Sequence, residues 1–331
     1  MSDYVRALVI SLVSLTTFAV NIPIICVTFR SRRFEHDSVA KLIASLAVSD
    51  IGNGIKASCC GSLAWSLEPG QQAPTWLVRF INSAMFGFGV CSIWHLAAVS
   101  VIKCTVIVLP LTHFTIFTDR VLCLVVTAIW TSSLVVGCAT NVGVTDVYFS
   151  RVTMLAYAKH RHRFMAAFAL INFVAPTLII MLAYTKVFLA VRRQVRSLPI
   201  ATIGRFGSRT IFGSSVRSAK NLFVMCAAHW LTFLPVTFSV VLRATSMTLP
   251  DAVQFAVSWT YVSSSAVNGI LYIALHSSVR RELSRCLPRC RRSPVVVTAS
   301  LQPVGDDTQH QEAPVSVMKS FRDHVTRRSD R

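Results

Sequence analysis

Two lysines and one aspartate stand inside long apolar stretches of the sequence, where a charge is costly without a partner or a function. Asp50 lies in the middle of one stretch, Lys56 follows it by six residues, and Lys103 lies near the end of another stretch. A carboxylate there suits a cation or hydrogen-bond donors, and an ammonium group suits an anion. No pair of acids, metal-spaced His/Cys set or nucleophile motif accompanies them, so we do not expect an enzyme.

Hydroxyl and amide groups provide a second set of candidates. Ser264, Ser265 and Asn268 lie at positions i, i+1 and i+4, so a helix places them on one face. Ser92 adds a hydroxyl in another apolar stretch.

Lys56 has two readings. Its long apolar stem allows the ammonium group to snorkel to the membrane surface. Alternatively, Lys56 pairs with an anionic ligand, helped by the basic segment 159–163.

The elements that position these groups are membrane helices. Of the 331 residues, 53% are hydrophobic and 14% are charged, whereas soluble domains carry about a quarter charged residues. Seven stretches are long enough to cross a hydrocarbon core. Continuous apolar runs exclude the alternating strands of a β-barrel, and a backbone in lipid must bond to itself, so the runs are helices. The predicted spans lie near residues 5–30, 38–66, 75–108, 119–141, 163–194, 215–243 and 251–274.

The fold class predicted is therefore an all-α membrane protein, a seven-transmembrane helix bundle with a short amphipathic eighth helix near residues 276–287. Val279 and Leu283 form the apolar side of that helix. Cys286 and Cys290 follow among arginines, where they are either palmitoylated or plain thiols. The receptor domain covers residues 1–288, and residues 289–331 are polar and predicted to be a disordered cytoplasmic tail.

The net charge of +19 is a topology signal and does not indicate a nucleic-acid partner. Basic residues concentrate after the first span, in segment 192–220 and from Arg280 onward. This asymmetry predicts a multi-pass plasma-membrane protein with its N-terminus outside and its C-terminus in the cytoplasm. The first stretch is read as a span because it is too long for a signal peptide and ends in a basic flank.

Landmarks on the seven spans resemble those of the rhodopsin-like family of G-protein-coupled receptors, over about residues 5–288. Each landmark is weak alone, but their order and spacing match the family. They are Asn21, Leu46-Ala47 with Asp50, Trp130, Pro176 followed by Tyr184, Pro235, and Asn268-Gly269-Ile270-Leu271-Tyr272.

The resemblance implies roles for several residues. Asp50, Ser92, Ser265 and Asn268 match the positions that hold Na⁺ in many members; alternatively, Asp50 is protonated or bonded to Asn268. Lys103, Tyr184 and Tyr272 match the G-protein side of the bundle. The positions of the conformational switch fall on Pro176, His229, Phe233 and Pro235.

The sequence also departs from the family. The usual Asp-Arg-Tyr triplet is Ile102-Lys103-Cys104, and Lys103 lacks both the planar fork of arginine and an acidic neighbour. Ser215 stands where a restraining Glu is usual, and Gly269 replaces a proline. We therefore expect a weakly locked inactive state and altered G-protein coupling.

Cysteine usage is another departure. Among the 10 cysteines, none lies at the outer end of the third span, where Val78 stands, and none lies in loop 140–163. The family's common disulfide therefore cannot form, and we expect this loop and the pocket entrance to be less constrained. Whether Cys59, Cys60 or Cys138 pair is open.

Single positions argue against two ligand classes. Val262 replaces the lysine that binds retinal, and Met85 replaces the aspartate that anchors amines, although Trp259 gives a faint monoamine-receptor cue. No cofactor is expected beyond Na⁺. The predicted pocket walls are Asn82, Met85, Phe86, Gly89, Phe168, Asn172, Val236, Thr237, Ser258 and Tyr261.

The expected function is transduction of an extracellular small-molecule signal to heterotrimeric G proteins, with arrestin and membrane lipid as further partners. The alternative is a seven-helix decoy or scaffold receptor that does not couple. A membrane transporter is a weaker alternative, because the sequence shows no internal repeat.

Overall fold

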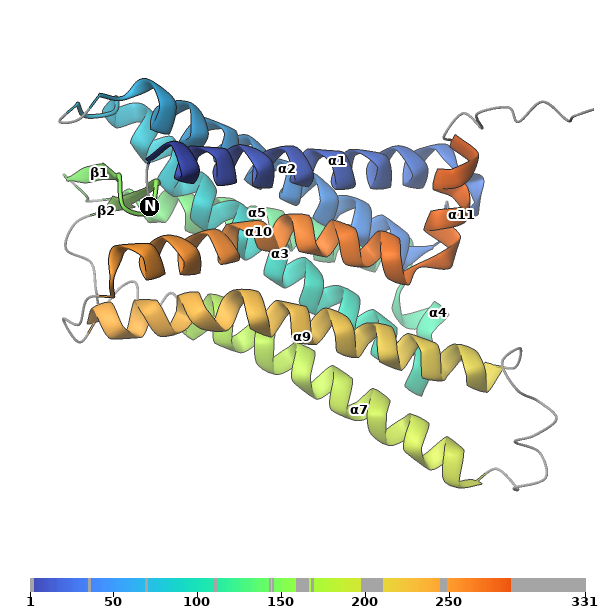
Figure 1. The fold of residues 1–331 in the computed structure, drawn as a ribbon. Helices are drawn as coiled ribbons and strands as arrows, with labels where there is room; N and C mark the ends of the chain where they lie inside the picture. Colours follow the sequence, from blue (N-terminus) through green and yellow to red (C-terminus); the bar gives the residue numbers. More distant parts are fainter. Residues whose placement is uncertain are drawn as a thin grey trace, which may run out of the picture. The chain divides into compact units, whose positions relative to one another are not determined.

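The computed structural model describes residues 3–34, 37–68, 71–109, 112–142, 144, 146–158, 167, 170–197, 211–244 and 249–286. Within these residues, seven helices of more than twenty residues run back and forth through one bundle (Figure 1). They are α1 (Asp3–Arg30), α2 (Ser38–Ser66), α3 (Thr75–Val108), α5 (Asp119–Ala139), α7 (Ala175–Ser197), α9 (Ile211–Ala244) and α10 (Asp251–Leu275). The predicted tail, 289–331, lies outside the described residues.

Short elements connect or continue these helices. The 3₁₀ turn η1 (Arg32–Phe34) follows α1, and α4 (His113–Ile116) precedes α5. A π-helical turn, η2 (Leu170–Val174), leads into α7, and α11 (Ser277–Cys286) follows α10. The helix starts are specified locally: Asp37 accepts hydrogen bonds from the backbone N–H groups of Val39 and Ala40 at 2.9 and 3.1 Å and so caps α2.

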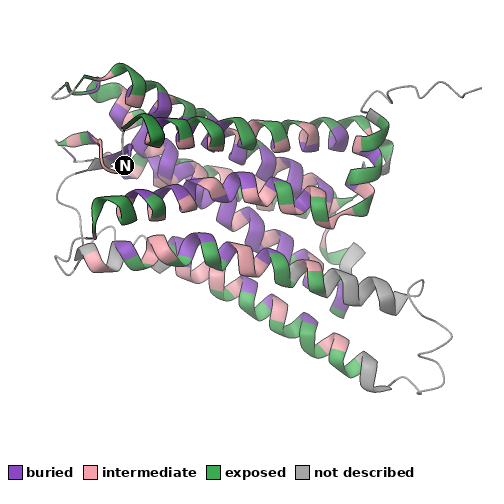
Figure 2. Ribbon diagram, viewed as in Figure 1, coloured by how far each residue is buried: buried purple, intermediate pink, exposed green. Residues whose placement is uncertain are grey.

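The outward faces of the helices suit a membrane. By length and composition, α1, α3, α5 and residues 171–193 could each cross one, and α9 contains a shorter apolar segment, Phe223–Ser239. Leu8, Leu124 and Leu231 are among the leucines that remain more than half exposed along these faces (Figure 2). Helices α2 and α10 contain polar residues, which lower their mean hydropathy, and many of these residues are buried inside the bundle.

Helix α3 is the centre of the bundle. Its most apolar segment is 78% buried, compared with 28% for α1 and 17% for α5. It packs against α2, α5, α7 and both hairpin strands. Side chains on α3 can therefore reach groups from several helices.

A two-stranded hairpin covers the end of the bundle at which the chain starts, which we call the hairpin end (Figure 1). Strands β1 (Val147–Ser150) and β2 (Leu155–Ala158) are antiparallel, with Ser150 opposite Leu155. At the turn between them, Met154 has a φ of 52°, in the left-handed region that a side chain rarely occupies.

At the opposite end, which we call the α11 end, α11 has the predicted amphipathic character. Val279 is 2% exposed and packs in a cluster with Ile24, Val27 and Tyr272, and Leu283 packs against the same cluster. The arginines of α11 are exposed. The apolar side of α11 thus anchors it to α1 and α10.

Candidate functional site

The four residues predicted to form a polar cluster lie together at the centre of the bundle. Asp50 on α2 is fully buried, and its Oδ1 accepts a hydrogen bond from Ser92 Oγ on α3 at 3.1 Å. Asn268 on α10 donates to the same Ser92 hydroxyl at 3.2 Å. Ser265 lies within hydrogen-bonding reach of the carboxyl group. The cluster therefore joins α2, α3 and α10.

The second carboxylate oxygen of Asp50 lacks a hydrogen-bond partner among the described residues, although it is buried. A buried polar atom without a partner is costly, so an unpaired carboxylate oxygen marks a place for a cation or a proton. Carboxylate, hydroxyl and amide oxygens are the ligands that a hard cation prefers. The side chains of this cluster therefore fit Na⁺ chemically.

Two asparagines extend the cluster. Asn53, one turn after Asp50, donates from Nδ2 to Ser265 Oγ at 3.0 Å. Asn21 on α1 donates from Nδ2 to the Ser265 backbone carbonyl at 3.2 Å. Asn21 was recognised as a landmark, but Asn53 was missed; its signal was its position three residues after Asp50, which puts it on the same side of α2.

Lys56 also joins this network, and it does not snorkel to the surface. Its side chain is buried, with 1% of the residue exposed, and Nζ donates to Asn53 Oδ1 at 3.2 Å. Asn53 lies one turn nearer the α11 end, so the ammonium group is turned back into the bundle. The network therefore contains a buried cation as well as a buried carboxylate.

Two of the predicted switch residues, His229 and Phe233, belong to an aromatic cluster. The ring of Phe233 on α9 lies 4.2 Å from that of His229, 5.2 Å from that of Tyr261 on α10, and 5.8 Å from that of Phe173, measured between centroids. Pro235 lies inside α9, and Pro176 is buried in α7. His229 Nε2 lies 3.3 Å from Thr177 Oγ1, so it has a hydroxyl partner on α7.

Gly89 on α3 makes room for this cluster. A Cβ atom added to Gly89 would lie 1.8 Å from the hydroxyl oxygen of Tyr261. Glycine is therefore required at this position as long as Tyr261 keeps its present orientation.

Part of the predicted pocket is occupied by the hairpin. Met154, Leu155 and Ala156 are at most 2% exposed and share one apolar cluster with Met85 and Tyr261. Val236 packs against this cluster, and Phe86 does so too. Thr237 is half-buried and Ser258 and Asn172 are buried, whereas Phe168 lies outside the described residues. Asn82 is buried, and its Nδ2 donates to Thr140 Oγ1 and Asn141 Oδ1 at the end of α5.

The expectation of a loosely constrained outer loop is wrong for the hairpin residues. Trp259 on α10 donates from Nε1 to the Thr153 carbonyl at 2.7 Å. Arg79 on α3 donates to the Val144 carbonyl at 2.9 Å, and Arg151 donates to the carbonyls of Leu67 and Glu68. Hydrogen bonds from long side chains to backbone carbonyls thus hold the loop without a disulfide. Cys59, Cys60 and Cys138 are free thiols.

At the α11 end, Lys103 contacts a residue that the sequence did not single out. Its Nζ lies 3.1 Å from His276 Nε2, between α10 and α11, and 3.8 Å from Met225 Sδ on α9. An ammonium group only donates, so Nε2 accepts and His276 Nδ1 donates to the Tyr272 carbonyl at 3.2 Å. The sequence signal for His276 was its place at the end of α10, directly before a basic helix.

The electrostatics of this contact keep His276 neutral. Burial, and then the positive charge of Lys103, lowers the pKa of His276 to about 3. A neutral imidazole can accept the Lys103 proton donor, but a protonated imidazole would repel it. The contact between α3 and the start of α11 is therefore sensitive to the protonation of His276.

The two tyrosines predicted on the G-protein side lie on different helices. Tyr272 is buried and its ring lies 4.3 Å from that of His276. Tyr184 on α7 packs against Phe223 of α9, with 5.5 Å between ring centroids, and against the cluster that contains Cys104. Palmitoylation stays a prediction, because the side chain of Cys286 and all of Cys290 lie outside the described residues.

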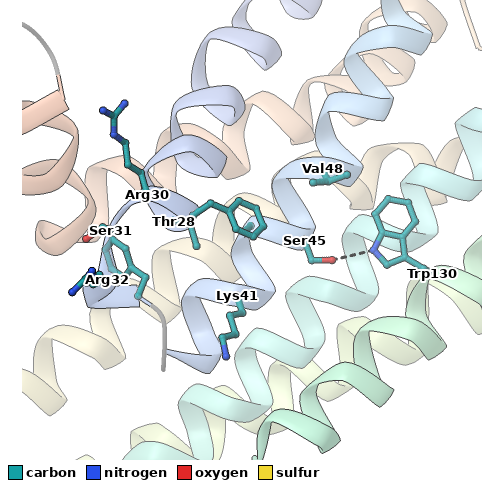
Figure 3. Close-up of a pocket in the computed structure, with 11 residues that line it drawn as sticks. Thr28, Arg30, Ser31, Arg32, Lys41, Ser45, Val48 and Trp130 are labelled. Atoms are coloured by element: carbon teal, nitrogen blue, oxygen red, sulfur yellow. Dashed lines mark hydrogen bonds between the residues drawn. The ribbon is translucent and has the colours of Figure 1, made fainter.

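A groove of about 760 Å³ lies between α1, α2 and α5 (Figure 3). It is lined neither by the polar cluster around Asp50 nor by the aromatic cluster around Phe233. Ser45 accepts a hydrogen bond from Trp130 Nε1 at 3.0 Å on its wall. The other side chains labelled in Figure 3 are Thr28, Arg30, Ser31, Arg32, Lys41 and Val48. None of the predicted pocket or network residues lines it, so the candidate site stays in the bundle interior.

Comparison with known proteins identifies the family. The model of the family described as 7 transmembrane receptor (rhodopsin family) matches residues 20–272. Similar proteins include Trace amine-associated receptor 7e of Rattus norvegicus, 24% identical over 262 residues, or 75% of this chain and 72% of that protein. Trace amine-associated receptor 7d of Rattus norvegicus is 25% identical over 261 residues, or 74% and 72%. Trace amine-associated receptor 6 of Mus musculus is 25% identical over 256 residues, or 72% of each chain.

Proposed function

Because this chain belongs to the rhodopsin family of seven-transmembrane receptors, which are non-enzymatic multi-pass proteins of the plasma membrane, we propose that it activates heterotrimeric G proteins when an extracellular small molecule binds. The hairpin end then faces outside, and the α11 end, with Arg30, Arg32, Arg280 and Arg281, faces the cytoplasm. This orientation agrees with the preference of cytoplasmic segments for basic residues. Membrane lipid contacts the apolar outward faces of the helices.

The contact between Lys103 and His276 carries this proposal. It joins α3 to the junction of α10 and α11 at the end where a G protein would bind. His276 supplies the acceptor that the missing acidic neighbour of Lys103 would otherwise provide. A neutral acceptor holds a lysine less firmly than a carboxylate does, so the inactive state is held weakly and coupling is atypical.

Guanine-nucleotide exchange tests this directly. Purified receptor is reconstituted with several heterotrimeric G proteins, and nucleotide exchange is compared with that in receptor-free vesicles. We expect measurable basal exchange that Lys103→Ala raises, because it removes the contact with His276, and that Lys103→Arg alters. Exchange equal to the receptor-free rate with every G protein would instead favour a decoy or scaffold, and an unchanged Lys103→Arg receptor would contradict the role of the altered triplet.

The second part of the proposal is a Na⁺ site at Asp50. Its support is the buried carboxylate oxygen without a partner, next to the hydroxyl of Ser92. Bound Na⁺ would neutralise this carboxylate and connect α2, α3 and α10. We expect NaCl to raise the unfolding temperature above that in choline chloride, and Asp50→Asn to remove the difference. A sodium-dependent rise that survives in Asp50→Asn would rule out this site.

The ligand site is proposed between α3, α7, α9 and α10, beneath the hairpin. The names of the relatives refer to trace amines, but Met85 stands where the aspartate that anchors an amine is expected. The signal would pass from this site through the aromatic cluster of Phe233 and Tyr261 to the polar network. Recruitment of arrestin by the activated receptor stays a prediction.

A further inference from the structure

Lys56 is a buried cation without a charged partner. It is 1% exposed, and its Nζ contacts the neutral amide oxygen of Asn53. No carboxylate of the described residues lies within 4.0 Å of its Nζ. The ion pairs among the described residues are Arg6–Asp3, Lys41–Asp119 and Arg285–Glu282, and none of them includes Lys56. Burial of an ammonium group without an opposite charge is unfavourable, and a methionine of similar length would avoid that cost.

The buried carboxylate of Asp50 does not fill this role. Its Oδ1 is bonded to Ser92, and it lies six residues before Lys56 on α2, on another side of the helix. Neutral groups separate the two charges, because Lys56 donates a hydrogen bond to Asn53 and Asn53 donates one to Ser265. If Asp50 holds a cation, the positive charge of Lys56 remains without a counterion.

The surroundings of Lys56 point to the ligand site. The next residue, Ala57, and Cys60 one turn later are buried in the apolar cluster that contains Met85 and Tyr261. The same cluster receives Leu155 of the hairpin. Lys56 thus adjoins, along α2, an apolar region that also contains residues of the hairpin.

We propose that Lys56 is the charge anchor of the ligand site and that the ligand is a small apolar carboxylate. The carboxylate would pair with the ammonium group of Lys56, and the apolar body would occupy the region that the hairpin turn now fills. This inference rests on the proposed function, because it names the class of ligand for that same site. It also explains the absence of an acid at Met85, since a carboxylate beside this region would repel such a ligand.

Probes of matched shape and different charge test the proposal. Phenylacetate, phenylacetamide and phenethylamine have similar shapes and carry a negative, no and a positive charge. Thermal unfolding of the purified receptor in lipid nanodiscs is measured over a concentration series of each probe, and binding to the folded state raises the unfolding temperature. We expect stabilisation by phenylacetate, little by phenylacetamide and none by phenethylamine. Longer aryl and alkyl carboxylates, each paired with its amide, extend the series.

Two variants locate the effect. Lys56→Met should weaken carboxylate binding by at least about 30-fold, the lower limit for loss of one partner of a buried charge pair. Lys56→Gln keeps a donor for Asn53 and guards against a folding defect of the first variant. Lys41→Met removes a half-buried lysine, bonded to Asp119 at the α11 end, and should leave carboxylate binding unchanged.

Three results would overturn the proposal: no preference for any carboxylate over its amide, equal stabilisation by the amine, or undiminished binding to both Lys56 variants. Unfolding measurements need no G protein, so the outcome is separate from that of nucleotide exchange. A receptor that binds carboxylates through Lys56 but does not promote exchange would support the anchor and count against coupling.

Discussion

The two ends of the bundle are held together by different chemistry. At the hairpin end, Trp259, Arg79 and Arg151 donate to backbone carbonyls, and an apolar turn fills the centre. At the α11 end, Lys103 donates to His276, whose acceptor nitrogen can itself take up a proton. The hairpin end is thus tied by side-chain donors on backbone carbonyls, and the α11 end by an imidazole that loses its acceptor role when it takes up a proton. We infer that the contacts of the hairpin end contribute most to the stability of the fold, and that the contact at the α11 end controls how readily the receptor is activated.

The largest expected effect is at the hairpin end. Leu155→Ala removes a side chain that is 2% exposed, and the cavity left in the apolar cluster should lower the free energy of unfolding by about 2–4 kcal/mol. Thermal unfolding in nanodiscs measures the loss. Leu134→Ala is the matched control, because Leu134 is 55% exposed on the outward face of α5. Equal losses in the two variants would show that the hairpin turn does not stabilise the fold.

The next effect concerns the hydrogen bond that replaces a disulfide in holding the turn. Trp259→Phe keeps an aromatic ring but leaves the Thr153 carbonyl without its donor, which should cost about 1–2 kcal/mol. Protease cleavage of the loop should become faster as well. Trp230→Phe, at a residue 37% exposed on α9, is the control. A Trp259→Phe receptor as stable and as resistant as the unmodified one would contradict the role of this bond.

Acidification should act at the α11 end. The pKa of His276 is lowered to about 3 in the closed contact, whereas a released, exposed histidine has a pKa near 6.5. The state in which Lys103 is bonded to His276 is therefore fully favoured above about pH 6.5. It loses stability as the pH falls towards 3, because His276 takes up a proton more readily in the released state, in which this bond is broken and the imidazole is exposed. Between pH 7.5 and 6.0, the population of the released state should rise about four-fold.

Basal nucleotide exchange at the two pH values measures this shift, and His276→Gln provides the control. A glutamine oxygen can still accept from Lys103 but does not titrate. The pH dependence of the receptor should exceed that of the variant by the expected factor. Equal pH dependence in both would assign the effect to the G protein and remove His276 from the mechanism.

The smallest effect is expected at an exposed ion pair of the α11 end. Lys41 and Asp119 lie 2.7 Å apart, but the aspartate side chain is 72% exposed, so Lys41→Met should change the free energy of unfolding by less than about 1 kcal/mol. Thermal unfolding at low and high salt measures this. A loss comparable to that of Leu155→Ala would mean that surface charges, too, stabilise this end.

The seven-helix fold and its family could be predicted from the sequence, and the match to the rhodopsin family confirms both. The reason is that a membrane-spanning helix needs a continuous apolar stretch of about 20 residues, which the local composition shows directly. The residues of the central network, Asp50, Ser92 and Asn268, could be found in the same way, because a polar group inside an apolar stretch is conspicuous in a single sequence.

Contacts between distant segments could not be predicted. Nothing near His276 indicates that it meets Lys103, and the hydrogen bonds that hold the hairpin join residues far apart in the sequence. The direction of Lys56 depends on an acceptor one turn back, Asn53, which competes with the membrane surface for the ammonium group. Asn82 likewise turns towards α5, because Thr140 and Asn141 offer it partners there.

The close approach of Gly89 and Tyr261 restricts the order in which this receptor can change. Alanine at position 89 would collide with the Tyr261 hydroxyl, but after a change of Tyr261 to phenylalanine the nearest ring atom would lie about 3.1 Å from the new methyl group. Gly89→Ala thus becomes tolerable after Tyr261→Phe has occurred. In the reverse order, the receptor with Gly89→Ala and an unchanged Tyr261 would contain a steric clash. In descendants of this chain, a side chain at position 89 should therefore appear only after Tyr261 has changed, so that the history of this site would depend on a single hydroxyl group.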